Sequence, residues 1–458
     1  LLILALVSTV QAQQSYRFAV DSVRVQQVAV GDWIRQQLDD NALIAVHDAG
    51  AIRYIGERPI YDLIGLGTQG AAVAWRHGSG AQFELMERRE HPPDYFATYP
   101  GVYSIPYFAE TDLFAEQIFE TEYYPRRTAG TAEPQQVIYK ADWNLAKRGS
   151  KPQDPHLLQI TAGLPLVAAV DVADLEDEQA REMTWSEGVV QPGFATEVRQ
   201  NHYASDAAIE LIDGGRLVSG QVTFPVTSEP GYPLILAARL HPISAGAVEV
   251  FVDGQHAGLW RYPSAPGRWI ETAFVIPADL IHSAETAIEL QAAGDENAPP
   301  FPLYYLWAWQ GQPREDVPVL PGDSDSFEFG TGIKLVDLDL DLSPAGQEIP
   351  LTLYWQTEIP QTVDAKLFLH LYDDQGQIVA QVDQRPYFDT QPPYTWIPGI
   401  SLVDPIQFTL PADLAPGRYT LALGLYDPVT GQRFAVSGPA ERMLPDARVL
   451  LGEFEVHS

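Results

Sequence analysis

The chain has 458 residues, of which 46% are hydrophobic and 19% are charged. This is enough apolar material for about two to four separately packed domains. Its 61 acidic residues outnumber 28 basic ones, which gives a formal net charge of -33. Nucleic acid and an anionic membrane surface are therefore excluded as partners, because both are bound by clustered Lys and Arg. No cysteine occurs, which excludes disulfides, thiolate metal sites and cysteine nucleophiles.

The first residues, LLILALVSTVQA, are apolar and then small or polar. Two interpretations of residues 1–15 stay open. Val10-Gln11-Ala12 resembles the small-x-Ala end of a secretory signal segment. The same stretch also resembles the last turns of a membrane helix. Both place the rest of the chain outside the cytoplasm, at the cell surface or secreted, and restrict membrane contact to this N-terminal segment.

Residues 16–145 alternate between short helical and strand patterns, which predicts an α/β domain. An amphipathic helix is expected over 16–38, with a break near Gly31. Strands are expected at 43–46 and in RPIYDLIGL (58–66), with a helical turn in AIRYIG (51–56) between them.

Three polar residues of this region, Asp48, Tyr54 and Asp62, lie near the ends of the expected strands. They either converge on a ligand or have structural roles, with Asp48 as a helix cap and Asp62 bonded to its own turn. We expect the structural roles, because no nucleophile–base pair or phosphate-binding loop accompanies them.

Residues 155–312 and 330–458 contain short strands separated by turn signals, which predicts two antiparallel β-sandwiches, jelly-roll-like or immunoglobulin-like. A hairpin is expected in GAVEVFVDGQHAGLWRY (246–262), with its turn at Asp253-Gly254. Stretches rich in Pro, Gly and charge at 146–155 and 312–330 predict exposed linkers. The predicted fold class is therefore multidomain, α/β followed by all-β.

The stretch GDWIRQQLDDNALIAVHDAGAIRYIGERPIYDLIGL and the later LFLHLYDDQGQIVAQVDQRP and PGRYTLALGLYDPVTGQRF carry a family resemblance. They resemble the extracytoplasmic C-terminal part of multi-pass membrane glycosyltransferases of the dolichyl-phosphate-mannose type (family 39-like), as found in filamentous green bacteria and relatives. Asp48, Gly50 and Tyr54 match an Asp-x-Gly-x-x-x-Tyr element of such proteins. The family's catalytic acidic residue lies between early membrane helices, which this sequence lacks. The resemblance therefore implies location and a glycan or lipid-linked sugar as partner, with no catalytic residue in this chain.

The stretch LWRYPSAPGRW (259–269) is the strongest candidate for carbohydrate binding. Sugar rings dock on aromatic faces while arginine takes the hydroxyl groups. Strand alternation places neighbouring side chains on opposite faces, so not all of them reach one pocket, and we expect the tryptophans in the sandwich core. The candidates are Trp260, Arg261, Tyr262, Arg268 and Trp269.

A row of carboxylates in LVDLDLDLS is a weak candidate for Ca²⁺. Asp337, Asp339 and Asp341 share one face of the expected strand, and Ca²⁺ takes about six to eight oxygen ligands. A solvated strand face is the stronger interpretation, because EF-hand spacing is missing. No other cofactor is predicted.

The sequence shows no Gly-x-Ser-x-Gly, His-Glu-x-x-His, Walker or dinucleotide motif. Enzymatic activity stays open, since the carboxylate pair of a glycosidase has no short signature. The leading hypothesis is a non-catalytic extracytoplasmic module set of a membrane glycosyltransferase-like protein, for carbohydrate handling or cell-surface architecture. The alternative is a secreted structural protein that self-associates into a surface layer or filament, or contacts other surface proteins.

Overall fold

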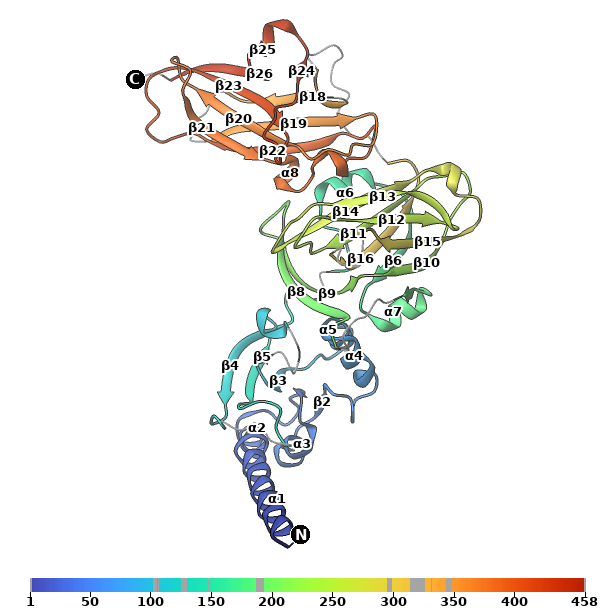
Figure 1. Cartoon of the computed structure of the whole chain (residues 1–458), viewed down its shortest axis with the longest axis vertical. Helices are drawn as coiled ribbons and strands as arrows, with labels where there is room; N and C mark the ends of the chain where they lie inside the picture. The colour runs from blue at the N-terminus through green and yellow to red at the C-terminus, as the bar shows by residue number, and fades with distance from the viewer. Residues whose placement is uncertain are drawn as a thin grey trace.

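The computed structural model describes residues 2–101, 105, 107–124, 130–146, 149–186, 193–294, 299–313, 326–330, 332–342 and 348–456. The molecule is elongated (Figure 1), with a helix at one end, then an α/β domain, a middle β domain and a C-terminal β domain at the other end. The predicted fold class, mixed α/β followed by all-β, is confirmed. Most of the predicted linker at 312–330 (residues 314–325) lies outside the described residues.

A continuous helical run opens the chain: α1 (Leu2–Val23), the π-helical turn η1 (Arg24–Val28) and α2 (Ala29–Gln37). The break expected near Gly31 is wrong, because the irregular turn precedes it and Gly31 is buried within α2. A Cβ on Gly31 would lie 2.9 Å from Cβ of Ile55 in helix α3 (Ala49–Gly56). Glycine is therefore needed for the close packing of α2 on α3.

Helix α1 projects from the α/β domain (Figure 1) and exposes Ile3, Leu6 and Tyr16. Within the described part of the chain, no helix combines the length and the apolar character that a membrane span requires.

The α/β domain is built on a five-stranded sheet in the order β2-β1-β3-β5-β4. Strands β2, β1 and β3 are parallel, and β5 and β4 are antiparallel to their neighbours. The expected strands and the helical turn between them are confirmed as β1, β2 and α3. The elements are β1 (Ile44–Val46), β2 (Ile60–Asp62), α4 (Ala71–His77), α5 (Ser79–Glu87), β3 (Tyr95–Thr98), η2 (Phe108–Glu110), β4 (Phe114–Glu120) and β5 (Val137–Ala141).

The two faces of this sheet are buried in different ways. One face packs on α2 and α3 through Ile34, Ile52 and their neighbours. The other face packs on α5, and its hydrophobic core also contains Val198 from strand β8 (Thr196–Tyr203) and Ile212 from strand β9 (Glu210–Val218) of the middle domain. The α/β domain and the middle domain therefore share one core instead of meeting through a free linker.

The middle domain places a hydrophobic core between a five-stranded sheet, β13-β12-β15-β10-β7, and a six-stranded sheet, β11-β14-β8-β9-β16-β6. The expected hairpin is confirmed as β12 and β13, and its turn residues Asp253 and Gly254 have φ of 48° and 79°. The elements are α6 (Pro155–Ile160), β6 (Leu166–Asp171), α7 (Leu175–Ala180), β7 (Thr184–Ser186), β8 (Thr196–Tyr203), β9 (Glu210–Val218), β10 (Gln221–Thr227), β11 (Leu234–Leu240), β12 (Gly246–Val252), β13 (Gln255–Tyr262), β14 (Arg268–Ile276), η3 (Ala278–Leu280), β15 (Glu285–Ala292) and β16 (Phe301–Gln310).

The C-terminal domain also packs two five-stranded sheets, β22-β19-β18-β17-β24 and β21-β20-β23-β26-β25, around one core. Its turn α8 has left-handed backbone angles at three consecutive residues, Tyr387, Phe388 and Asp389, a conformation that costs energy for side chains with a Cβ. The elements are β17 (Phe327–Phe329), β18 (Ile333–Leu340), β19 (Glu348–Thr357), β20 (Lys366–Tyr372), β21 (Ile378–Gln384), α8 (Pro386–Asp389), η4 (Pro393–Thr395), β22 (Leu402–Thr409), β23 (Gly417–Tyr426), β24 (Val436–Ser437), η5 (Ala440–Arg442), β25 (Met443–Leu444) and β26 (Arg448–Val456).

Candidate functional site

The polar residues near the ends of β1 and β2 do not converge on one ligand. Tyr54 points outward from α3 and is 85% exposed. Asp62 is buried, and its carboxylate accepts backbone N–H groups from Ile64 and Gly65, both at 3.1 Å, and from Gly67 at 2.7 Å. The structural role predicted for Asp62 is therefore confirmed.

Asp48 differs from its expected role as a helix cap. It stands at the N-terminus of α3, but its side chain makes no capping bond there. Its carboxylate instead accepts hydrogen bonds from the Tyr99 hydroxyl and from Nε2 of Gln136, the latter at 2.6 Å, and lies 3.3 Å from Nδ1 of His47. Burial, together with the Asp48 charge, raises the pKa of Tyr99. Asp48 thus joins β1 to two segments that are distant in sequence.

We expect Asp62→Ala to lower the free energy of unfolding by about 2 kcal/mol, because three backbone N–H donors lose the buried carboxylate that accepts from them. Asp62→Asn keeps one acceptor oxygen and should cost about half as much. Urea denaturation measures both, with Asp413→Ala as the exposed control. A change at Asp62 as small as that of the control would contradict the assignment.

Two of the five candidate carbohydrate residues are core residues. Trp269 is 0% exposed, packs on Tyr304, and donates from Nε1 to the Leu211 carbonyl at 3.2 Å. Tyr262 is 1% exposed and lies in the core between the sheets, beside Phe301. As possible sugar contacts these two assignments are wrong, because neither ring has a free face.

The other three candidates lie toward the C-terminal domain. Trp260 is 3% exposed, packs on Phe274 and borders a cleft. Arg261 is half-buried, lines the same cleft, and donates from Nη1 to the Thr362 carbonyl at 3.4 Å. Arg268 donates to the Phe388 carbonyl at 2.9 Å but does not line the cleft. The structure therefore brings Trp260 and Arg261 to one site and separates Arg268 from it.

This interdomain cleft has a volume of about 470 Å³. Strands β13 and β14 of the middle domain form one wall, and residues 360–362 and 394–398 of the C-terminal domain form the other. Its rings are Trp260, Phe274, Tyr394 and Trp396, and its polar side chains include Arg261, Gln361 and Thr395. Strand β13 is the last of its sheet, so one row of its backbone donors and acceptors has no partner strand.

The rings of the cleft differ in how much surface they offer. Trp396 is fixed by its Nε1, which donates to the Gln391 carbonyl at 2.8 Å. Phe274 and Tyr394 are half-buried, so part of each ring faces the cleft, and burial raises the pKa of Tyr394 to about 12. The cleft therefore combines accessible aromatic surface with groups that form hydrogen bonds.

A second polar feature lies on the outer face of the six-stranded sheet, around Arg239 of β11. This side chain is 0% exposed and donates to Asp213 at 2.6 Å and to Glu271 at 3.3 Å. It also donates to the Tyr203 hydroxyl at 2.6 Å and to the Lys151 carbonyl at 3.0 Å. The buried guanidinium is thus enclosed by two carboxylates, a phenol and a backbone carbonyl.

The predicted linker at 146–155 contributes to this network. Ser150, Lys151 and Pro155 are exposed as expected, but Asp154 is buried. Backbone N–H groups of Gln153 and Asp154 donate to Oε2 of Glu271 at 2.8 and 2.9 Å. The Asp154 carboxylate caps α6 by accepting from the backbone of His156 and Leu157. These bonds hold residues 153–154 against the six-stranded sheet, since Glu271 belongs to its strand β14.

The same network continues into the C-terminal domain through Tyr387. Its hydroxyl donates to Asp154 at 3.1 Å, and its backbone N–H donates to Asp404 at 2.8 Å. Asp404 also accepts from Nε1 of Trp355 at 2.9 Å. Burial raises the pKa of Asp404 to about 7, and burial together with the Glu271 charge raises that of Asp154 to about 7.

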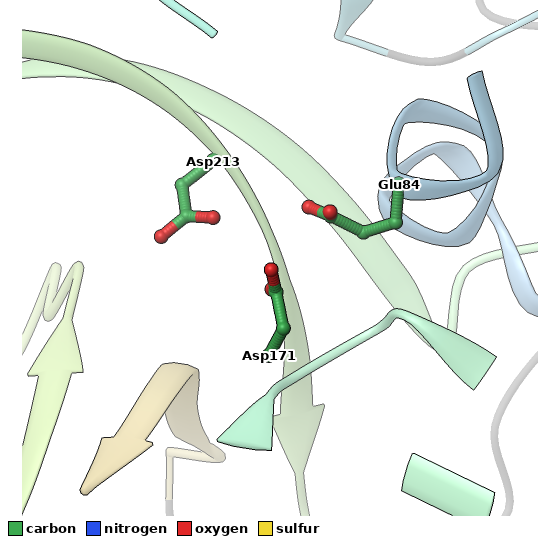
Figure 2. A group of neighbouring side chains, drawn as sticks. All are labelled: Glu84, Asp171 and Asp213. Atoms are coloured by element: carbon green, nitrogen blue, oxygen red, sulfur yellow. The ribbon is translucent and has the colours of Figure 1, made fainter. Parts of the chain in front are cut away.

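At its other end the network reaches the α/β domain. Figure 2 shows the carboxyl groups of Glu84, Asp171 and Asp213 pointing toward one another from α5, β6 and β9, with oxygens that lie within 4.8 Å. Glu84 also accepts the backbone N–H of Gly214 at 2.9 Å. Burial and mutual repulsion raise the pKa of Glu84 and Asp171 well above their ordinary values. Protonation is therefore easier for Glu84 and Asp171 than for carboxyl groups in water.

The three aspartates proposed for Ca²⁺ do not form a site. Among the described residues, Asp337, Asp339 and Asp341 are not grouped at metal-ligand distance, whereas the acidic cluster is. Asp339 instead accepts the Tyr354 hydroxyl at 2.7 Å, and Asp341 follows the end of β18. The solvated strand face is the better description.

Sequence reasoning missed the far wall of the cleft and all members of the buried network. These residues come from separate elements, and no local spacing connects them. The one available signal was the aromatic and arginine content of LWRYPSAPGRW, which located one wall of the cleft.

Comparisons with known proteins give distant likenesses. Residues 13–156 match the model of a domain of unknown function, DUF8728. No protein with a curated description matches the chain. Beta-glucuronidase 2 of Bacteroides uniformis is 12% identical over 48% of this chain and 26% of its own, with a TM-score of 0.19. A family 35 carbohydrate binding module from Clostridium thermocellum is 10% identical over 31% of this chain and 95% of its own, with a TM-score of 0.20. The chain thus spans about a quarter of the glucuronidase that it matches.

Proposed function

We propose that this chain is a non-catalytic, extracytoplasmic set of modules that handles carbohydrate, with a saccharide bound in the interdomain cleft. The observation that carries the proposal is the composition of this cleft. Its volume of about 470 Å³ suits a small ligand, since ligand pockets measure roughly 300–1,000 Å³.

The walls of the cleft match the two kinds of surface on a sugar. The C–H faces of a pyranose pack on aromatic rings, and Phe274 and Tyr394 offer such surface. Hydroxyl groups need donors and acceptors, which Gln361, Thr395 and the free edge of β13 supply. The two domains that carry these groups are fixed relative to each other by the buried network, so the cleft is formed before a ligand arrives.

The sequence resemblance to membrane glycosyltransferases supports the proposed context. The resemblance implies that such modules lie outside the cytoplasm and meet a glycan or lipid-linked sugar. In this context the cleft binds a saccharide, while glycosyl transfer is catalysed by a separate membrane part.

The test is a glycan array followed by calorimetry on the full chain. We expect Tyr394→Ala to weaken saccharide binding by about tenfold, equivalent to about 1.4 kcal/mol. Tyr54→Ala, an exposed ring far from the cleft in sequence, is the matched control and should bind like wild type. Ligand binding should also change tryptophan emission, because Trp260 and Trp396 line the cleft. A folded wild-type chain that binds no saccharide, or unchanged binding by Tyr394→Ala, would refute the proposal.

A further inference from the structure

The buried and half-buried arginines of this acidic chain fall into two groups, those paired with carboxylates and those, such as Arg261, Arg268 and Arg448, that donate to backbone carbonyls. Arg239, Arg216 and Arg385 each form ion pairs with carboxylates at 2.6 to 2.7 Å. Arg261 has no such pair within the described part of the chain, and its polar contact is the Thr362 carbonyl at 3.4 Å. Arg261 differs from Arg268 and Arg448 in its position, because it lines the cleft and they do not.

The described residues that line the cleft supply no carboxylate to Arg261. None of the described residues lining the cleft is acidic, and Arg261 is the one charged residue among them. Asp364 acts electrostatically on Tyr394 in the cleft wall. Its carboxylate, however, is already bound by Arg385 through two hydrogen bonds of 2.9 and 2.7 Å. Arg261 is therefore the one charged group that the described lining of the cleft offers to a ligand.

We propose that the ligand of the cleft carries a carboxylate, so that the preferred saccharides are acidic ones that contain a uronic acid. This inference rests on the proposed function. The planar guanidinium offers paired donors that match the two oxygens of a carboxylate. In a half-buried cleft such a pair is screened less than in bulk water. A neutral sugar would cover Arg261 without supplying a counter-charge.

Arg261 also has a simpler role available, as a contact that holds the two domains together. Arg268 provides the comparison, because it too donates to a backbone carbonyl of the C-terminal domain, at 2.9 Å, but does not line the cleft. A role limited to joining the domains would make the two arginines equivalent. If Arg261 binds an anion, substitution of Arg261 should affect the binding of acidic saccharides and substitution of Arg268 should not.

The experiment compares trimers of galacturonic and glucuronic acid with their carboxyl-reduced, neutral counterparts, by calorimetry on the full chain. We expect wild type to bind at least one acidic trimer about tenfold or more tightly than its neutral counterpart, as one charge-assisted pair provides. Arg261→Gln should remove this preference. Arg268→Gln should keep the preference.

The outcomes separate this inference from the proposed function. Equal affinity for acidic and neutral trimers, or binding only of neutral saccharides, would overturn the acidic class while carbohydrate binding stands. A preference that survives in Arg261→Gln, or is lost equally in Arg268→Gln, would overturn the role of Arg261. Failure to bind any saccharide would overturn the proposed function and this inference together. Thermal melts of each variant show whether a lost preference reflects a lost fold.

Discussion

Replacing Arg239 by methionine should lower the free energy of unfolding by about 3–5 kcal/mol, which is the cost of leaving buried charges without a partner. Its guanidinium is fully buried and forms ion pairs with both Asp213 and Glu271. Methionine fills a similar volume. The lost free energy of unfolding therefore comes from removing the charge and not from creating a cavity. Arg418→Met is the control, because Arg418 pairs with Glu453 at the surface and such pairs contribute about 0–1 kcal/mol.

Urea denaturation followed by tryptophan fluorescence gives these energies, and limited proteolysis locates the loosened region. Because the Lys151 carbonyl accepts from Arg239, cleavage within 149–155 should increase in Arg239→Met before the domains unfold. Adding Asp213→Asn and Glu271→Gln to the methionine variant should recover part of the loss, since the uncompensated carboxylates are then removed. If the free energy of unfolding of Arg239→Met lies within about 1 kcal/mol of wild type, the network around Arg239 does not hold the 149–155 segment on the sheet.

The sequence predicted those parts of the fold that depend on neighbours along the chain. Alternation over 246–262 and the Asp253-Gly254 turn defined the β12–β13 hairpin, because side-chain period and turn residues are local properties. The failure at Gly31 has the opposite origin. Glycine in a helical pattern suggests a break, yet here it admits the side chain of Ile55 from another helix.

The Asp213-Gly214-Gly215 sequence shows the same limit. Its composition is typical of a turn, but it lies inside strand β9. A Cβ at Gly214 would lie 2.5 Å from Oε1 of Glu84, and one at Gly215 would lie 2.5 Å from the Tyr304 ring. The glycines are required by the approach of α5 and β16, which no pattern within the strand encodes.

For the candidate site too, the sequence predicted only what depends on neighbouring residues along the chain. Of the candidates in LWRYPSAPGRW, Trp260 and Arg261 line the cleft, but alternation could not tell which rings would be covered. Trp269 is buried by Tyr304, and the cleft needs residues 394–398, more than a hundred positions downstream of that loop. The packing of one domain on another therefore decides which of the predicted residues can meet a ligand.

The second large effect expected is a loss of stability as the pH rises through neutrality. Asp154 and Asp404 have an ordinary pKa of 3.8, and burial raises it to about 7 in the folded chain. Between these values the folded state holds protons that the unfolded chain has released, so unfolding releases protons and stability falls as pH increases. The contribution is complete below about pH 4 and is lost above about pH 7. Each group adds a slope of up to about 1.4 kcal/mol per pH unit within this window.

Urea midpoints measured between pH 5 and pH 9 should therefore decrease toward neutral pH and then level off. Asp404→Asn removes one titrating group with a raised pKa and should flatten the curve, whereas Asp413→Asn, an exposed control, should leave its shape unchanged. Midpoints that rise from pH 5 to pH 8 would contradict the sign of this argument.

This pH dependence should reach the cleft, because the same two carboxylates hold Tyr387 from opposite ends. Its backbone donates to Asp404 and its hydroxyl donates to Asp154 of the middle domain. The turn that carries it has left-handed backbone angles at three residues, so it depends on these contacts to keep its shape. When both carboxylates ionise, the cost of burying each charge opposes the docking of the C-terminal domain, which supplies one wall of the cleft. Saccharide affinity should thus fall above about pH 7 in wild type and fall less steeply in Asp404→Asn, as calorimetry at pH 6 and pH 8.5 would measure.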